Sequence, residues 1–273
     1  EKDYNGDVHF TYDVKDGHGG VTHTGASTSL AAVNDASQLD SHLAVGEITE
    51  DNTSRPMSND LKSQWTNLDT TDVDGSTEAN IVQIEINGVV HQVPSDFAMN
   101  LQGNHGAFVT THSTDGHNKW HYVADNSHNE IQGLKDGQSL TDSMTLITAD
   151  GTRIPITAII RGTDDHVIID TPAATTATLG IVVEDSTTSV TGMLLAHDSD
   201  TDDTVHFQAE TTIGSYGTLT VNKDGSWHYD LDHAKANSLG ASETKAEGFD
   251  VVAISSDGST VTQHIEVTVQ GSD

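Results

Sequence analysis

The sequence has 273 residues, enough for one large domain or for two or three small ones. It contains 42 Asp and Glu against 11 Lys and Arg, and the resulting formal net charge of -31 argues against binding to nucleic acid or to an anionic membrane surface. Cysteine is absent, which excludes disulfides and thiolate metal sites. We also find no apolar run of the length that membrane insertion needs.

The first predicted element is a hairpin over residues 8–24. Apolar and polar residues alternate from Val8 to Val14, and Asp16-Gly17 supplies the turn. Residues 1–36 are therefore interpreted as the C-terminal hairpin of an incomplete repeat, and the opening residues are typical of the interior of a longer protein. Two alternatives stay open for this segment, namely a simple cut through a longer array or strands that complete the sandwich of another chain.

Residues 37–170 are predicted to form a full repeat. Ile81–Val93 reads as an inserted hairpin that turns at Asn87-Gly88, because this dipeptide provides the positive φ angles of a tight turn. The segments His105–Tyr122 and Met144–Ile159 have the same strand, Asp-Gly, strand pattern. The sequence therefore predicts three hairpins in this repeat.

Residues 171–273 repeat the same order of elements, with hairpin signals at Tyr216–Tyr229 and Phe249–Ile265. Trp120 and Trp227 occupy matching positions and are predicted to anchor the two cores. Helical periodicity is brief, near residues 126–134 and 232–239. Alternation of period two with frequent turn signals predicts an all-β chain of tandem β-sandwich repeats.

The most specific motifs lie in the last repeat. They are Glu184-Asp185, Asp198-Ser-Asp200, Tyr216-Gly-Thr-Leu-Thr-Val and Asp224-Gly-Ser-Trp-His-Tyr. With these motifs the chain resembles the VCBS-type repeats of giant RTX adhesins on bacterial surfaces, whose sandwiches are cadherin-like and immunoglobulin-like. The central repeat departs from the pattern through its insertion and through Gly106-Ala-Phe-Val.

The resemblance implies a secreted, extracellular protein of the bacterial cell surface that binds calcium. It also implies an extender region whose repeats contact one another and hold distal adhesive domains away from the cell. Two other functions stay open. The inserted hairpin could belong to an adhesive module that binds a host, biofilm or cell-surface ligand, or the chain could be a subunit of an extracellular filament or matrix that self-associates by strand sharing.

Calcium takes six to eight oxygen ligands, so a site needs several carboxylates that the fold brings together. In cadherin-like arrays a linker, a Glu-Asp pair near the first strand and an Asp-x-Asp step converge, and the resemblance implies two such joints. The alternative is that these acidic loops only keep the protein soluble. The candidate calcium ligands are Asn34, Asp35, Glu50, Asp51, Asp72 and Asp74 at the first joint and Asp164, Asp165, Glu184, Asp185, Asp198 and Asp200 at the second, with Asp40 and Asp203 as replacements.

Two other kinds of chemistry have weaker support in the sequence. A zinc site would use His112, His117 and His121 near the Asp115-Gly116 turn, but these residues alternate along exposed strands. We find none of the nucleophile, metalloprotease or phosphate-loop motifs that would indicate an enzyme. The sequence therefore predicts a structural or binding protein.

Overall fold

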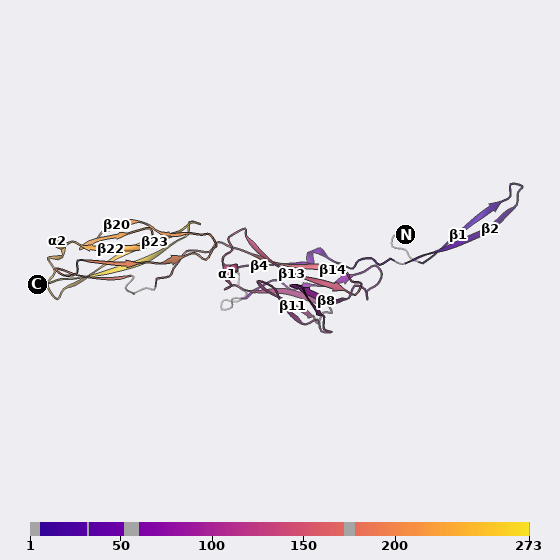
Figure 1. Cartoon of the computed structure of the whole chain (residues 1–273), viewed down its shortest axis with the longest axis horizontal. Coiled ribbons are helices and arrows are strands. Elements are labelled where there is room, and N and C mark those ends of the chain that lie inside the picture. Colours follow the sequence, from indigo (N-terminus) through magenta and orange to yellow (C-terminus); the bar gives the residue numbers. More distant parts are fainter. Residues whose placement is uncertain (1–5, 32, 52–59, 172–177, 273) are drawn as a thin grey trace. The chain divides into compact units, whose positions relative to one another are not determined.

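The computed structural model describes residues 6–31, 33–51, 60–171 and 178–272 (Figure 1). They divide into two compact units, the first formed by Glu1–Ile48, Asn52–Asp125 and Leu140–Ile160 and the second by Thr49–Asp51, Asn126–Ser139 and Arg161–Asp273. The chain is nearly all β and contains two sandwiches, which confirms the predicted fold class. Within the described residues, no helix has the length and apolar character needed to span a bilayer.

The N-terminal hairpin consists of β1 (Gly6–Lys15) and β2 (Val21–Leu30), which pair along their whole length. The turn follows Asp16, and Gly17 has a φ of 76°, as the Asp-Gly signal predicts. Phe10 and Tyr12 alternate with polar residues and are 55% and 51% exposed. The hairpin therefore presents an apolar row that the described residues leave uncovered.

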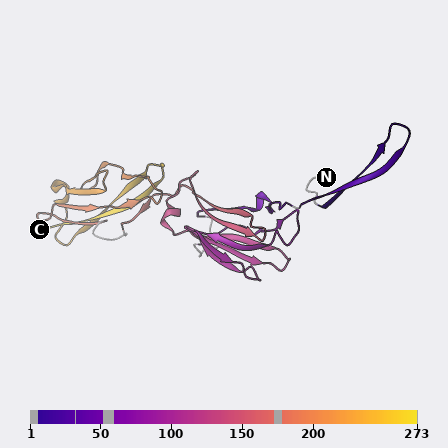
Figure 2. The same ribbon diagram turned by 45° about the vertical axis from the view of Figure 1, so that its right-hand side comes forward.

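The first sandwich has two five-stranded sheets, which Figure 2 shows as two layers. One sheet contains β10 (Met99–Gln102), β11 (Gly106–His112), β12 (Asn118–Asp125), β5 (Asp60–Lys62) and β6 (Thr66–Asn67). The other has the order β4 (Val45–Thr49), β14 (Arg153–Arg161), β13 (Ser139–Thr148), β8 (Ile81–Ile86) and β9 (Val89–Gln92).

The inserted hairpin of the first sandwich extends the second of these sheets. β8 and β9 turn at Asn87 and Gly88, whose φ angles are 49° and 76°, and β8 pairs with β13. The hairpin predicted at Ile81–Val93 is therefore confirmed, and β9 forms an edge of the sheet.

The second sandwich repeats this design with two four-stranded sheets. One has the order β16 (Leu179–Val183), β24 (Thr260–Gln270), β23 (Thr244–Ser255) and β19 (Val205–Phe207), and the other β17 (Ser189–Met193), β22 (Ser226–Leu231), β21 (Gly217–Val221) and β20 (Glu210–Ile213). The short remaining elements are β3 (Gln38–Leu39) paired with β7 (Thr70–Thr71), β15 (Ile168–Ile169) paired with β18 (Ala196–His197), η1 (Ser41–Leu43), α1 (Asn129–Gln132) and α2 (His233–Ala236).

A buried tryptophan centres each core, as predicted. Trp120 is 0% exposed and Trp227 is 1% exposed. Each ring packs against a glycine, because a Cβ on Gly46 would lie 2.9 Å from the Trp120 ring and one on Gly192 would lie 2.4 Å from the Trp227 ring. The second-sandwich equivalent of Gly46 is Gly180 on β16, whose Cβ would lie 3.4 Å from the Trp227 ring, whereas Gly192 lies on β17 beside Trp227 in the same sheet.

The first and last strands of the second sandwich are parallel, and this positions the acidic residues. β16 pairs with β24 in parallel register, so the turn after β16 lies beside the end of β24. The Glu184 N–H accordingly donates to the Gln270 carbonyl at 2.9 Å, and the Glu50 N–H donates to the Arg161 carbonyl at 3.0 Å in the equivalent turn. Asp51 and Asp185 both adopt left-handed φ angles, of 58° and 62°.

Candidate metal centre

The segment that follows β14 binds an acidic loop through its backbone. The Asp165 N–H donates to Asp200 Oδ2 at 2.8 Å, and the Asp200 N–H donates to Asp198 Oδ1 at 3.1 Å. Ligand oxygens of Asp198, Asp200 and Asp203 all lie within 4.8 Å of one another. The short loop after β18 thus brings three carboxylates together, and its hydrogen bond to the Asp165 backbone places a fourth acidic residue next to them.

Glu50 and Asp51 complete this cluster. The Thr163 N–H donates to Glu50 Oε1 at 2.5 Å, and Glu50 is only 1% exposed. The Asn126 side chain holds Asp51 through an Nδ2–Oδ1 hydrogen bond of 2.8 Å, and the Asp51 carboxyl contributes to the raised pKa of Asp165. We call Glu50, Asp51, Asp165, Asp198, Asp200 and Asp203 the acidic centre.

The acidic centre leaves buried carboxylate oxygens without partners. Six buried side-chain atoms in the described part of the chain have no hydrogen-bond partner, and five of them belong to this centre. Unpaired buried acceptors are costly, because they lose water and gain nothing in return. A hard cation would satisfy them, so the donor set fits calcium. The five atoms are Glu50 Oε2, Asp165 Oδ2, Asp198 Oδ2, Asp200 Oδ1 and Asp203 Oδ2.

The electrostatics of the acidic centre agree with this interpretation. Burial raises the pKa of Glu50 to about 7, and the Asp165, Asp51 and Asp200 charges add to the effect. Burial also raises the pKa of Asp165 to about 6 and that of Asp200 above its usual value. The fold therefore holds carboxylates together at a cost that either protons or a metal ion would relieve.

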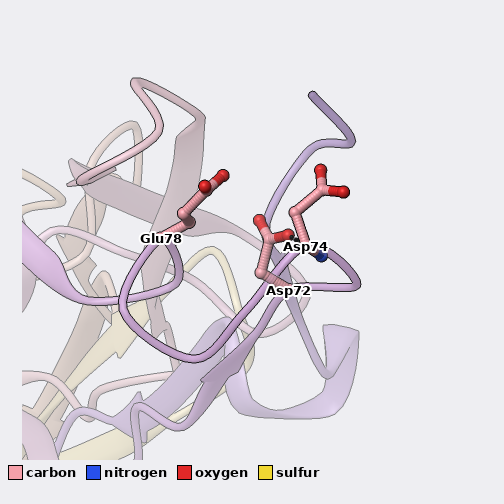
Figure 3. A group of neighbouring side chains, drawn as sticks. All are labelled: Asp72, Asp74 and Glu78. Atoms are coloured by element: carbon pink, nitrogen blue, oxygen red, sulfur yellow. Dashed lines mark hydrogen bonds between the residues drawn. The ribbon is translucent and has the colours of Figure 1, made fainter. Parts of the chain in front are cut away.

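A second acidic group lies in the first sandwich, on the loop between β7 and β8. Figure 3 shows the Asp72, Asp74 and Glu78 side chains pointing to the same side of this loop. The Asp35 N–H donates to Asp74 Oδ2 at 2.7 Å, and the Asp74 N–H donates to Asp72 Oδ1 at 2.8 Å. These bonds match those of Asp165, so the two loops share one geometry. All three carboxylates are partly exposed.

The grouping of ligands expected from the sequence needs a correction. Glu50 and Asp51 were assigned to the joint with Asp72, but they lie with Asp165. The reason is the parallel pairing of first and last strands, which brings the turn after the first strand beside the end of the last strand. Glu184 lies correspondingly at the far end of the second sandwich, where its Oε2 accepts the Ser272 N–H at 3.3 Å.

The remaining candidates have other contacts. Asp185 Oδ2 accepts the Ser272 hydroxyl at 2.9 Å, and Asp164 Oδ1 accepts the Asp136 N–H at 3.0 Å. Asn34 is exposed and donates from Nδ2 to the Asp35 carbonyl at 3.0 Å. Asp40, one of the two replacement ligands, instead accepts the His42 N–H at 3.0 Å in the turn of η1.

Two charged residues near these groups were not among the predicted ligands. Glu78 joins the first acidic group, and the Lys135 ammonium lies 2.9 Å from Asp203 Oδ1 in the acidic centre. Neither carries a recognisable spacing in the sequence, although Glu78 lies only four residues after Asp74. Among the described residues, the two groups of three side chains that could hold a metal ion contain no histidine. His121, considered for zinc, instead packs on Trp65 with ring centroids 3.9 Å apart.

Comparison with known proteins relates the second sandwich to a family. Residues 170–271 match the family model of the bacterial cadherin-like domain. Cadherin-like domains are extracellular adhesion modules, and the second sandwich has their fold. No curated protein matches the sequence.

Solved cadherin ectodomains are distant structural neighbours of this chain. Mouse clustered PcdhgC3 EC1-3 is 13% identical and covers 98% of this chain and 77% of its own, with a TM-score of 0.42. Protocadherin Gamma C5 EC1-3 is 11% identical, with coverage of 97% and 77% and a TM-score of 0.44. The human Desmocollin-1 ectodomain is 11% identical, with a TM-score of 0.36, and this chain spans only 47% of it.

Proposed function

We propose that this chain is a calcium-stabilised extender region of a secreted bacterial surface adhesin, which holds distal adhesive domains away from the cell. The observation that carries the proposal is the acidic centre, with its five unpartnered buried carboxylate oxygens. Support also comes from the match to a bacterial cadherin-like domain and from the repetition of the acidic loop in both sandwiches.

Calcium bound at the acidic centre would join segments that otherwise repel. Glu50 and Asp51 follow β4, Asp165 follows β14, and Asp198, Asp200 and Asp203 lie on the loop after β18. A divalent ion shared among them replaces that repulsion with attraction, so the cation stiffens the chain where these segments meet. With ambient calcium some tens of times above the dissociation constant, linkage contributes about 2 kcal/mol per site.

Calorimetry and small-angle scattering test this proposal together. Calcium should bind with a dissociation constant of roughly 0.1–1 mM, and a chelator should broaden the distribution of interatomic distances. Asp200→Asn should abolish both effects, because Asp200 is 3% exposed and carries an unpartnered oxygen. Asp224→Asn is the matched control, since Asp224 accepts only turn bonds from Ser226. Scattering that a chelator leaves unchanged would count against the extender function.

We also propose that residues 1–36 are the closing hairpin of a further repeat, followed by repeats at 37–170 and 171–273. In β1 the apolar row contains Phe10 and Tyr12, which are 55% and 51% exposed, whereas the matching row of β23 contains Val251 and Ala253, which are 5% and 0% exposed. The similarity suggests that the β1 row is built to be covered by a sandwich.

The hairpin could be covered by its own repeat in a longer array or by the sandwich of another copy of the chain. Sedimentation velocity distinguishes these two possibilities. If it completes the sandwich of another copy, the protein should associate as its concentration rises, and a double variant Phe10→Ser, Tyr12→Ser should not. A wild-type protein that stays monomeric at high protein and calcium concentrations would exclude strand sharing and the filament function.

A further inference from the structure

A basic side chain of the described residues, Lys135, contacts the acidic centre. Lys135 Nζ lies 2.9 Å from Asp203 Oδ1, and the two side chains are 28% and 5% exposed. The Ser256 hydroxyl donates to the same Asp203 oxygen at 2.5 Å, whereas Asp203 Oδ2 is buried and has no partner. Asp203 thus has one oxygen bound by the protein and one oxygen free for an ion.

The backbone holds the Lys135 loop against the acidic centre. The Gly133 carbonyl accepts the Thr201 N–H at 3.1 Å, and the Asp136 N–H donates to Asp164 Oδ1 at 3.0 Å. The contact with the segment after β14 is so close that a Cβ on Gly162 would lie 2.4 Å from the Lys135 carbonyl. Since bonds on both sides fix the loop, the ammonium is presented to Asp203 from a restrained backbone.

A fixed positive charge in this position has two opposite effects. Without a metal ion it attracts Asp203 and weakens the repulsion among the carboxylates. With a metal ion it repels the ion, because solvent screens like charges only weakly at close range in a partly buried site. The pKa of Lys135 is raised, chiefly by its hydrogen bond to Asp203, so the side chain stays charged at neutral pH.

We propose that Lys135 is a resident counter-cation of the acidic centre, which stabilises the metal-free state and keeps the affinity for calcium low. The calcium half of this inference rests on the proposed function, whereas the metal-free half rests only on the contacts of Lys135. A weakened site releases calcium as its concentration falls towards the dissociation constant, roughly 0.1–1 mM, so the lysine makes the stiffness of the chain responsive to ambient calcium.

Replacing Lys135 with Met tests the inference, because Met keeps the length and apolar stem of the side chain. In the full chain, Lys135→Met should lower the unfolding temperature in a chelator and tighten calcium binding measured by calorimetry by about tenfold, a gain of about 1.4 kcal/mol. Lys135→Arg keeps the charge and should behave like the wild type. Lys245→Met is the control, because Lys245 forms a comparable 2.9 Å ion pair with Glu243 outside the acidic centre.

The outcomes separate this inference from the proposed function. Calcium affinity that is unchanged or weaker in Lys135→Met would overturn the counter-cation role, as would an Arg variant that behaves like the Met variant. If the wild type binds no calcium, the proposed function fails, and unfolding in a chelator still decides the metal-free half. If Lys135→Met is no less stable in a chelator than the Lys245→Met control, the proposed stabilisation of the metal-free state by Lys135 is overturned.

Discussion

Replacing Glu50 with Gln should change stability in opposite directions without and with calcium. Gln keeps the oxygen that accepts the Thr163 N–H, which lies 2.5 Å from Glu50 Oε1, and removes the negative charge. In the metal-free protein, burial and the neighbouring carboxylates raise the pKa of Glu50 from 4.5 to about 7. That difference corresponds to roughly 3 kcal/mol of unfavourable free energy once the group is ionised.

The sign of the pH dependence follows from the raised pKa. Glu50 does not destabilise the fold below its unfolded pKa of 4.5, and the cost grows as the pH rises from 4.5 to the folded value of about 7, above which it is constant. Glu50→Gln should therefore stabilise the metal-free protein by about 2–3 kcal/mol near pH 8 and by almost nothing near pH 4.5. For a domain of roughly 100 residues this is a rise in unfolding temperature of about 10 °C.

Thermal unfolding followed by circular dichroism measures both directions. In a chelator the Glu50→Gln variant should unfold at the higher temperature, whereas saturating calcium should stabilise only the wild type, by about 2 kcal/mol. Glu184→Gln is the matched control, since Glu184 is 3% exposed in the equivalent turn at the other end of the second sandwich. A Glu50→Gln variant with the same unfolding temperature as the wild type near pH 8, or with an undiminished response to calcium, would refute this reasoning.

Three other predictions concern the ions and the core. Calcium affinity should fall as the pH drops from about 7 to about 6, because both raised carboxyl groups take up protons, and calorimetry in buffers of different ionisation enthalpy should detect protons released on binding. We expect the acidic centre to be the tighter of the two calcium sites. The stoichiometry of calcium binding should therefore show that Asp74→Asn leaves this site intact and that Asp200→Asn removes it. Gly192→Ala should destabilise the second sandwich by about 1–3 kcal/mol in urea, because its Cβ would lie 2.4 Å from the Trp227 ring, whereas Gly240→Ala has open space and should not.

Local signals in the sequence were sufficient for the hairpins and the cores. A tight hairpin turn needs a residue with a positive φ angle, and an Asp-Gly or Asn-Gly pair provides one. Positive φ angles are found at all four predicted turn glycines, Gly17, Gly88, Gly116 and Gly225. Alternation around Trp120 and Trp227 identified the buried faces, because side chains on one face of a strand recur every second residue. These features depend on neighbours within about ten residues, so a single sequence contains them.

Features that depend on tertiary burial were not predictable in the same way. Asp142 and Glu247 lie at equivalent positions of two hairpins and resemble surface residues in the sequence. In the structure they are 3% and 7% exposed, and each accepts a buried tyrosine hydroxyl at 2.5 Å, from Tyr122 and Tyr229 respectively. Only the packing of the opposite sheet shows that these two carboxylates hold the sandwich together.

The two acidic groups differ in a way that follows from the parallel pairing of end strands. In each, a backbone N–H from the preceding segment binds the second Asp of the Asp-x-Asp step, so the loop itself is preformed. Only the acidic centre also receives the buried Glu50, and only there are carboxylate oxygens buried without partners among the described residues. We therefore expect the buried Glu50 charge to make the acidic centre bind calcium more tightly than a preformed acidic loop alone. The partly exposed group at Asp72 should hold calcium more weakly, because water still satisfies its oxygens.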